Sequence, residues 1–186
     1  MKQRSYKLEA IILARRNIGE ADRLLTIFSE QQGKLRVIAK GVRRPTSRKR
    51  GSVELFNQVS IFLARGKTFN IITEVEVKNN FNEWRKDLAK VGIAYHLAEV
   101  VNKLTREEQE QKKVYEILES AFNYLTKIDY SRMAEFVIRF KKAILTDLGF
   151  LHPSAPIESG QADVDATIEN LIQARLRTRR FLKFLN

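Results

Sequence analysis

The chain has 186 residues, 44% of them hydrophobic, which is enough for one medium-sized domain or two small ones. With 8 glycines, 3 prolines and 30% charged residues, the composition excludes a disordered, collagen-like or low-complexity chain. The absence of cysteine excludes disulfides, thiolate zinc sites, iron–sulfur clusters and cysteine nucleophiles. The 34 basic residues exceed the 22 acidic ones by 12, which favours polyanionic partners, nucleic acid before an anionic membrane.

No segment predicts a leader peptide or a membrane span. The apolar stretch near the N-terminus, residues 10–14, is shorter than the apolar region of a signal peptide, and no run approaches about 18 apolar residues. We therefore expect a cytoplasmic, nucleoid-associated protein with no membrane partner.

The positive charge is concentrated in the first part of the chain. Residues 1–80 carry 17 basic and 7 acidic side chains, whereas residues 81–186 carry 17 and 15. The hydrophobic periodicity changes at the same point, so the sequence predicts one domain over residues 1–80 and another over residues 81–186.

The first part has the pattern of a small β-barrel. Apolar and β-branched runs at residues 7–14, 22–29, 35–42, 55–64 and 69–77 alternate with turn-forming sequences. Five short strands within about 80 residues are typical of an OB-fold, although an SH3-like barrel has nearly the same pattern. In the last run, Glu74 and Glu76 are expected to face solvent, opposite Val75 and Val77.

The second part has helical periodicity, so the predicted fold class is α+β, an OB-fold barrel followed by an all-α domain. One long or two consecutive helices are expected from Trp84 to Leu104, and another over residues 114–125. A third is expected to start at an N-cap Ser131 and to end near Leu148. Residues 151–164 predict a loop, with Asp163 and Asp165 just before a last helix that continues into the basic residues 177–184.

Enzyme signatures are absent, so we expect no catalytic residues, no cofactor and no metal. No glycine-rich phosphate loop occurs. His96 is expected at the edge of a helix face and His152 in a loop, without a second histidine beside either. Glu20 and Asp22 are expected to pair with nearby arginines (Arg15, Arg16 or Arg23) rather than to hold a metal ion.

The strongest local signal is residues 33–51, which contain eight cations and no acid. Such charges repel one another unless a polyanion screens them, so we predict that they contact nucleic-acid phosphates. Alternation over residues 34–42 places the cations over a buried face. The predicted nucleic-acid-binding residues are Lys34, Arg36, Lys40, Arg43, Arg44, Arg48, Lys49 and Arg50. Phe56, Phe62 and Phe69 are expected in the core, with base stacking as the alternative.

Several ordered blocks resemble bacterial RecO recombination mediator proteins: residues 9–13 (EAIIL), 19–26 (GEADRLLT) and 33–44 (GKLRVIAKGVRR), followed by Ser47 and Arg48. Residues 145–150 (LTDLGF) and the basic terminal helix are similar to the helical half of that family. The resemblance implies an OB-fold and a helical domain that bind single- and double-stranded DNA. It also implies strand annealing and recombinase loading in the repair of DNA damage, with RecR and the single-strand-binding protein as partners.

Many members of that family insert a four-Cys zinc module after the Leu-Gly-Phe turn. Here residues 151–164 occupy that place without a cysteine, so the chain resembles a variant that lacks the module, and no zinc site is carried over.

The resemblance also implies a site in the helical domain for the acidic, Phe-ended tail of the single-strand-binding protein. The residues expected to hold it are Arg132, Arg139 and Lys142, with Phe136 and Ile144 between them. The alternative is that these charges are only the solvated face of a core helix. Two other functions remain open: an RNA-binding OB module, and a small metal-dependent nuclease that uses Glu20 and Asp22.

Overall fold

The computed structural model describes residues 5–152 and 161–185. The chain divides into two compact units, each described below by itself. One comprises Met1–Asn80 and Arg106–Lys112, and the other Phe81–Thr105 and Lys113–Asn186. A division at residue 80 alone would assign Arg106–Lys112 to the helical part, whereas the structure groups this heptapeptide with the strands.

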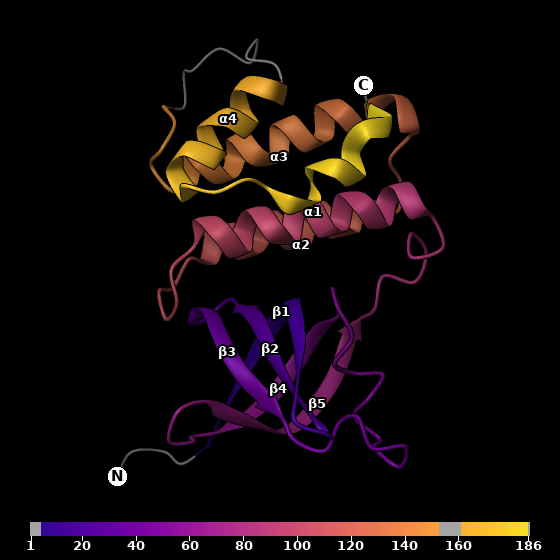
Figure 1. Cartoon of the computed structure of the whole chain (residues 1–186), viewed down its shortest axis with the longest axis vertical. Helices are drawn as coiled ribbons and strands as arrows, with labels where there is room; N and C mark the ends of the chain where they lie inside the picture. Colours follow the sequence, from indigo (N-terminus) through magenta and orange to yellow (C-terminus); the bar gives the residue numbers. More distant parts are fainter. Residues whose placement is uncertain (1–4, 153–160, 186) are drawn as a thin grey trace. The chain divides into compact units, whose positions relative to one another are not determined.

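The first unit is a closed five-stranded barrel (Figure 1). Its strands are β1 (Ser5–Ile18), β2 (Asp22–Ser29), β3 (Gly33–Ala39), β4 (Gln58–Ala64) and β5 (Asn70–Asn79). The strand order is β1-β2-β3-β5-β4, and β3 and β5 close the barrel through a short parallel contact. This arrangement is an OB-fold, so the predicted fold of the first part is confirmed.

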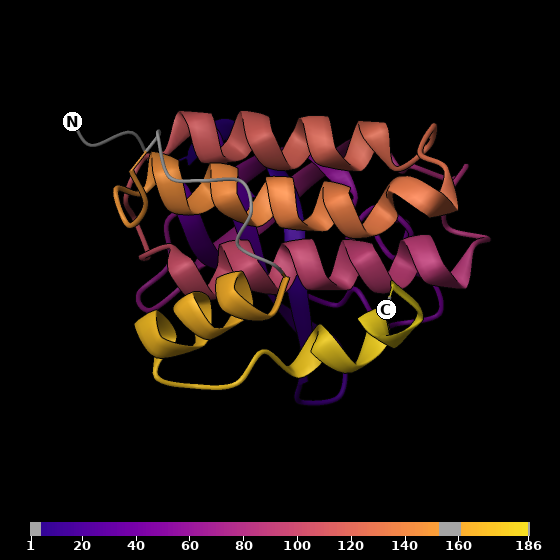
Figure 2. The same ribbon diagram turned by 90° about the horizontal axis from the view of Figure 1, so that it is seen from above.

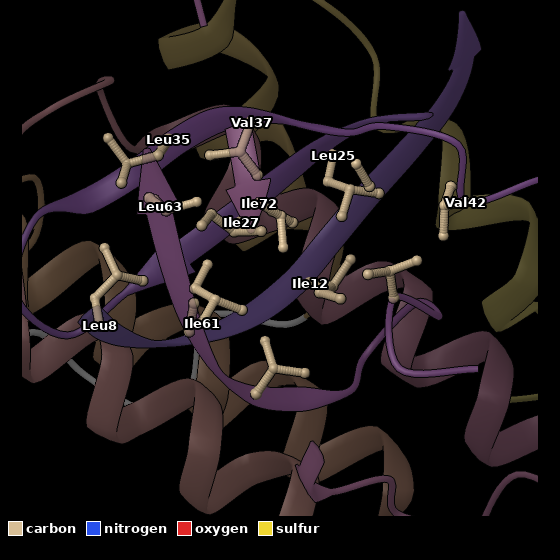
Figure 3. Close-up of a cluster of buried hydrophobic side chains, with 14 residues drawn as sticks. Leu8, Ile12, Leu25, Ile27, Leu35, Val37, Val42, Ile61, Leu63 and Ile72 are labelled. Atoms are coloured by element: carbon tan, nitrogen blue, oxygen red, sulfur yellow. The ribbon is translucent and has the colours of Figure 1, made fainter. Parts of the chain in front are cut away.

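The long first strand makes closure possible because it pairs with strands on both sides. Ala10 lies opposite Ser29 of β2 and opposite Val59 of β4. The register shifts between Ile12 and Ala14, and such a bulge bends a strand around a barrel. Alternate side chains then fill the interior (Figure 3), including Leu8, Ile12, Leu25, Ile27, Leu35, Val37, Ile61, Leu63 and Ile72.

The heptapeptide Arg106–Lys112 extends the sheet beside the start of β3. The parallel pairing of β3 with β5 begins only at Val37, which leaves the edge at Lys34 open. Glu107 forms a parallel bridge with Lys34, and the Glu108 amide donates to the Lys34 carbonyl at 2.9 Å. The approach needs a glycine at position 33, because a Cβ there would lie 1.8 Å from a carbonyl oxygen of the heptapeptide.

The second unit is all-helical (Figure 2). Its elements are α1 (Leu88–Leu104), α2 (Lys112–Tyr124), the 3₁₀ turn η1 (Tyr130–Arg132), α3 (Met133–Asp147), α4 (Gln161–Ile172) and the 3₁₀ segment η2 (Arg177–Leu185). Helix α1 packs against α3, α4 and η2. No helix in the described part of the chain combines the length and apolar character needed to cross a membrane.

The first helix begins later than the periodicity predicts. Trp84 lies in a turn before it and packs against Phe81 and Phe122, donating its ring N–H to the Phe122 carbonyl at 3.0 Å. The Asp87 carboxylate accepts from the backbone amides of Ala89 and Lys90, and this cap starts α1 at Leu88. Tryptophan is apolar and in phase with the helix, so periodicity alone could not exclude it.

Three expectations about the later helices are wrong. Ser131 is not an N-cap: it lies inside η1, and α3 begins at Met133 without a side-chain cap. The predicted loop over residues 151–164 gives way to α4 at Gln161, and residues 153–160 lie outside the described part of the chain. The last helix is two elements, α4 and η2, because Gln173 adopts a positive φ of 50° and ends α4.

Candidate nucleic-acid interface

Strand β3 carries the first of the predicted cations on its outer face. Leu35, Val37 and Ala39 are buried, whereas Lys34 is half-buried and Arg36 is exposed between them. The predicted alternation along this strand is therefore confirmed.

The remaining cations lie on residues 40–50, here called the basic loop, which is a series of turns between β3 and β4. Val42 is buried in the barrel core and anchors the start of the loop. The Gly41 amide donates to the Asp22 carboxylate at 2.7 Å, and the Arg43 guanidinium donates to the Gly19 carbonyl at 3.0 Å. Lys49 donates to the Thr73 carbonyl of β5. These bonds attach the loop to the barrel.

The eight predicted side chains are not equivalent in the structure. Arg36 forms an ion pair with Glu107, with 2.8 Å between Nε and Oε1. Arg43 and Lys49 contact backbone carbonyls, which leaves their charges uncompensated. Four others are exposed and have no ion pair or side-chain hydrogen bond within the described residues: Lys40, Arg44, Arg48 and Arg50.

The acidic residues near this surface are arranged differently from the sequence-based expectation. Arg15 and Arg23 both pair with Glu54, Arg23 at 3.1 Å. Glu20 and Asp22 therefore do not pair with Arg15 or Arg23 as expected. The Asp22 carboxylate instead accepts a hydrogen bond from the Gly41 amide. In the described residues, no group of three or more acidic or histidine side chains is arranged to hold a metal ion.

Three aromatic residues were candidates for base stacking or for the core. Phe56 is buried, as the core interpretation predicts. Phe62 is 39% exposed, and the Lys7 ammonium lies 5.7 Å from its ring centroid. Phe69 is half-buried, with the Arg36 guanidinium 5.6 Å from its ring centroid. The core interpretation is therefore wrong for Phe62.

Sequence reasoning missed a second cation–aromatic pair. The Arg65 guanidinium lies 5.8 Å from the ring centroid of Tyr6 on β1, and the Tyr6 hydroxyl accepts from the Asn70 side chain at 2.9 Å. Partial burial raises the pKa of Tyr6 above its usual value, against the opposing charge of Arg65. Because these residues are 59 or more positions apart, only the strand pairing reveals their proximity.

The helical unit has a shallow apolar groove of about 690 Å³ between α2 and α3. Tyr124 and Phe136 line it with their ring centroids 5.4 Å apart. Two cations, Lys113 and Arg139, and two carboxylates, Glu116 and Asp147, also line it. Of the predicted partner-binding residues, Arg139 lines the groove and also pairs with Glu135. Arg132 and Lys142 do not line it. Ile144 is fully buried, so its expected availability on the surface is wrong.

Two buried polar contacts join four elements of the helical unit in pairs, α3 with α4 and α1 with η2. Lys141 of α3 and Asp165 of α4 form a fully buried ion pair at 2.5 Å, so Asp165 does not precede the last helix as expected but lies inside it. His96 of α1 is buried rather than at a helix edge, and its Nδ1 lies 2.9 Å from the Thr178 hydroxyl. Burial, with the nearby charges of Lys141 and Arg179, lowers the pKa of His96 to about 3. These buried contacts are explained by the packing of the helical elements, so no catalytic role is needed to account for them.

Two family models match the chain. One is described as Recombination protein O N terminal and covers residues 1–81, and the other as Recombination protein O C terminal and covers residues 85–153.

Curated relatives are named DNA repair protein RecO. The protein of Roseiflexus sp. (strain RS-1) is 42% identical over 118 residues, which are 63% of this chain and 41% of the relative. That of Desulforamulus reducens is 34% identical over 148 residues, which are 80% of this chain and 56% of the relative. That of Pelotomaculum thermopropionicum is 34% identical over 129 residues, which are 69% of this chain and 50% of the relative. The chain thus spans about half the length of the curated relatives it matches.

Proposed function

The chain belongs to the RecO family, and from that premise we propose that it acts in recombinational DNA repair as a non-enzymatic DNA-binding protein. It binds single- and double-stranded DNA through the barrel, promotes annealing of complementary strands, and assists recombinase loading. Its place of action is the nucleoid in the cytoplasm.

The observation that carries this proposal is the set of four exposed cations on the basic loop without counter-ions in the described residues: Lys40, Arg44, Arg48 and Arg50. Lysine and arginine side chains bind DNA mainly by displacing counterions from phosphates. Because phosphates carry no base information, the loop binds any sequence. Neutralising the phosphates of two strands lowers their mutual repulsion and needs no nucleotide hydrolysis.

The test removes these four charges together by substitution with glutamine. If about six phosphates are contacted, the logarithm of the affinity for single-stranded DNA falls with the logarithm of the salt concentration at a slope of about −4. The fourfold variant is expected to reduce this slope to about −1 and to slow annealing of complementary oligonucleotides.

A matched control removes four exposed cations from the helical unit: Lys86, Lys103, Lys127 and Arg175. The net charge of the two variants is identical, so a difference between them reports position rather than total charge. Equal salt slopes in the two variants would show that the basic loop has no special role.

The proposed protein partners are RecR and the acidic tail of the single-strand-binding protein. The groove between α2 and α3 supports the second, because it combines the apolar surface of Phe136 with the flanking cations Arg139 and Lys113. A buried ring and a carboxylate paired with a guanidinium suit a Phe-ended acidic peptide. In a titration with a labelled tail peptide, Arg139→Gln is expected to weaken binding, whereas Arg132→Gln and Lys142→Gln leave it nearly unchanged. Equal effects of all three substitutions would move the site away from the groove.

A further inference from the structure

The barrel unit contains a hollow of about 780 Å³ beside β3, within the size range of small-ligand sites. Its walls come from β1, the turn between β2 and β3, residues 65–70 and the heptapeptide Arg106–Lys112. Tyr6 and Phe69 both line it, and each ring lies within 6 Å of a guanidinium that also lines it, Arg65 and Arg36 respectively. Aromatic rings and guanidinium planes are the surfaces on which nucleobases stack.

The charges around the hollow do not favour a phosphate. Three cations face three carboxylates in its lining: Arg36, Arg65 and Lys67 against Glu107, Glu108 and Glu110. The closest of these pairs, Arg36 with Glu107, is an ion pair at 2.8 Å. The lining is therefore neutral overall, in contrast to the basic loop. A neutral, aromatic-lined hollow suits an uncharged planar group.

The rim of the hollow supplies hydrogen bonds for such a group. The side-chain amides of Gln31, Gln32 and Asn70 each carry both donors and acceptors, as the edge of a nucleobase does. Asn70 already donates to the Tyr6 hydroxyl, which orients both groups.

We propose that this hollow is a nucleobase subsite, which takes one unstacked base of a single strand. The proposal rests on the proposed function, since the basic loop must hold the phosphates of the same strand. A base in a duplex is paired and stacked, and extruding it costs a few kcal/mol. The subsite therefore gives the barrel a preference for single strands that phosphate contacts alone cannot provide.

The experiment compares two oligonucleotides of equal length, one with bases and one made of abasic residues, so that both present the same number of phosphates. The base-containing strand is expected to bind about tenfold more tightly, the size of one base–aromatic stacking contact. In Phe69→Leu this preference is expected to shrink at least threefold, while the affinity for the abasic strand stays the same. Arg65→Gln, at an exposed position, is expected to have the same effect and serves if Phe69→Leu does not fold.

Phe62→Leu is the matched control. Phe62 lies on the same barrel, is exposed and has a cation near its ring, but it does not line the hollow. Equal wild-type affinities for the two strands would overturn the proposal, and so would a Phe62→Leu effect as large as that of Phe69→Leu. The abasic strand reports phosphate binding alone. Loss of its affinity in the basic-loop variant therefore tests the proposed function separately from the subsite.

Discussion

His96 is expected to make the protein less stable in mild acid, by an amount that follows from its burial. The side chain is fully buried, and its Nε2 has no hydrogen-bond partner, so a protonated ring would be poorly solvated. The pKa of His96 is about 3 in the folded protein and 6.5 in an exposed histidine. Between these values the unfolded chain binds more protons than the folded one, and stability therefore falls as the pH falls. The loss through His96 alone is about 2 kcal/mol between pH 7 and pH 5.

The assay is urea denaturation at several pH values, with the wild type and His96→Asn compared at each pH. Asparagine has an amide that can stand in for Nδ1 toward Thr178 but does not titrate. The carboxylates contribute equally to both proteins and cancel in the difference. The free energy of unfolding of the wild type, relative to the variant, is expected to fall by about 2 kcal/mol from pH 7 to pH 5. If the difference in unfolding free energy between the wild type and His96→Asn does not change with pH, the proposed role of His96 is refuted.

Three further perturbations have defined outcomes. Lys141→Met leaves the Asp165 carboxylate buried without its main partner, and is expected to cost about 3–5 kcal/mol of unfolding free energy in urea denaturation. Glu107→Gln releases Arg36 for a phosphate, and is expected to raise the affinity for single-stranded DNA about two- to fivefold in a fluorescence anisotropy titration. Gly33 has a φ of +65°, and a Cβ added there would lie 1.8 Å from a backbone oxygen. Gly33→Ala is therefore expected to lower the unfolding free energy, measured by urea denaturation, by more than about 1 kcal/mol.

Each of these substitutions has a control on the same chain. The double variant Lys141→Met, Asp165→Leu removes both charges, and is expected to recover most of the loss. Glu74→Gln makes the same charge change at an exposed position of β5, and an equal rise in affinity there would show that only net charge matters. Gly51→Ala places a Cβ where no atom lies within 4 Å, and is expected to be nearly neutral. A Gly51→Ala loss as large as that of Gly33→Ala would rule out the close approach as the cause.

The strands could be predicted from the sequence because each has one face in the barrel core. A period of two over Leu35, Arg36 and Val37 reports that burial directly. The ends of helices were harder to predict. Trp84 is apolar and in phase with α1 but lies before it, and Ser131 is a good capping residue type that the chain places inside a 3₁₀ turn. Such ends depend on tertiary packing, which overrides local preference.

The cations of the candidate site could be predicted from the sequence, but their acidic partners could not. Its cations adjoin one another in the sequence, so their clustering was visible. Their partners were not, because Glu107 meets Arg36 from 71 positions away and Glu54 meets Arg15 from 39. No periodicity connects residues at such separations. The heptapeptide that carries Glu107 lies between two helices in the sequence and packs on the barrel only in the fold.

The way the cations are distributed bears on annealing. A protein that anneals strands must hold their phosphates and leave the pairing edges of the bases accessible. In the barrel unit, Arg36 is paired with Glu107, and Arg15 and Arg23 share Glu54. The basic loop, by contrast, carries six cations without an ion pair in the described residues: Lys40, Arg43, Arg44, Arg48, Lys49 and Arg50. A loop with these six cations contacts only about six phosphates. The proposed subsite takes a single base. Under the proposed function, most bases of a bound strand therefore remain free to pair with a complementary strand. The same cations lower the repulsion between the phosphates of the two strands.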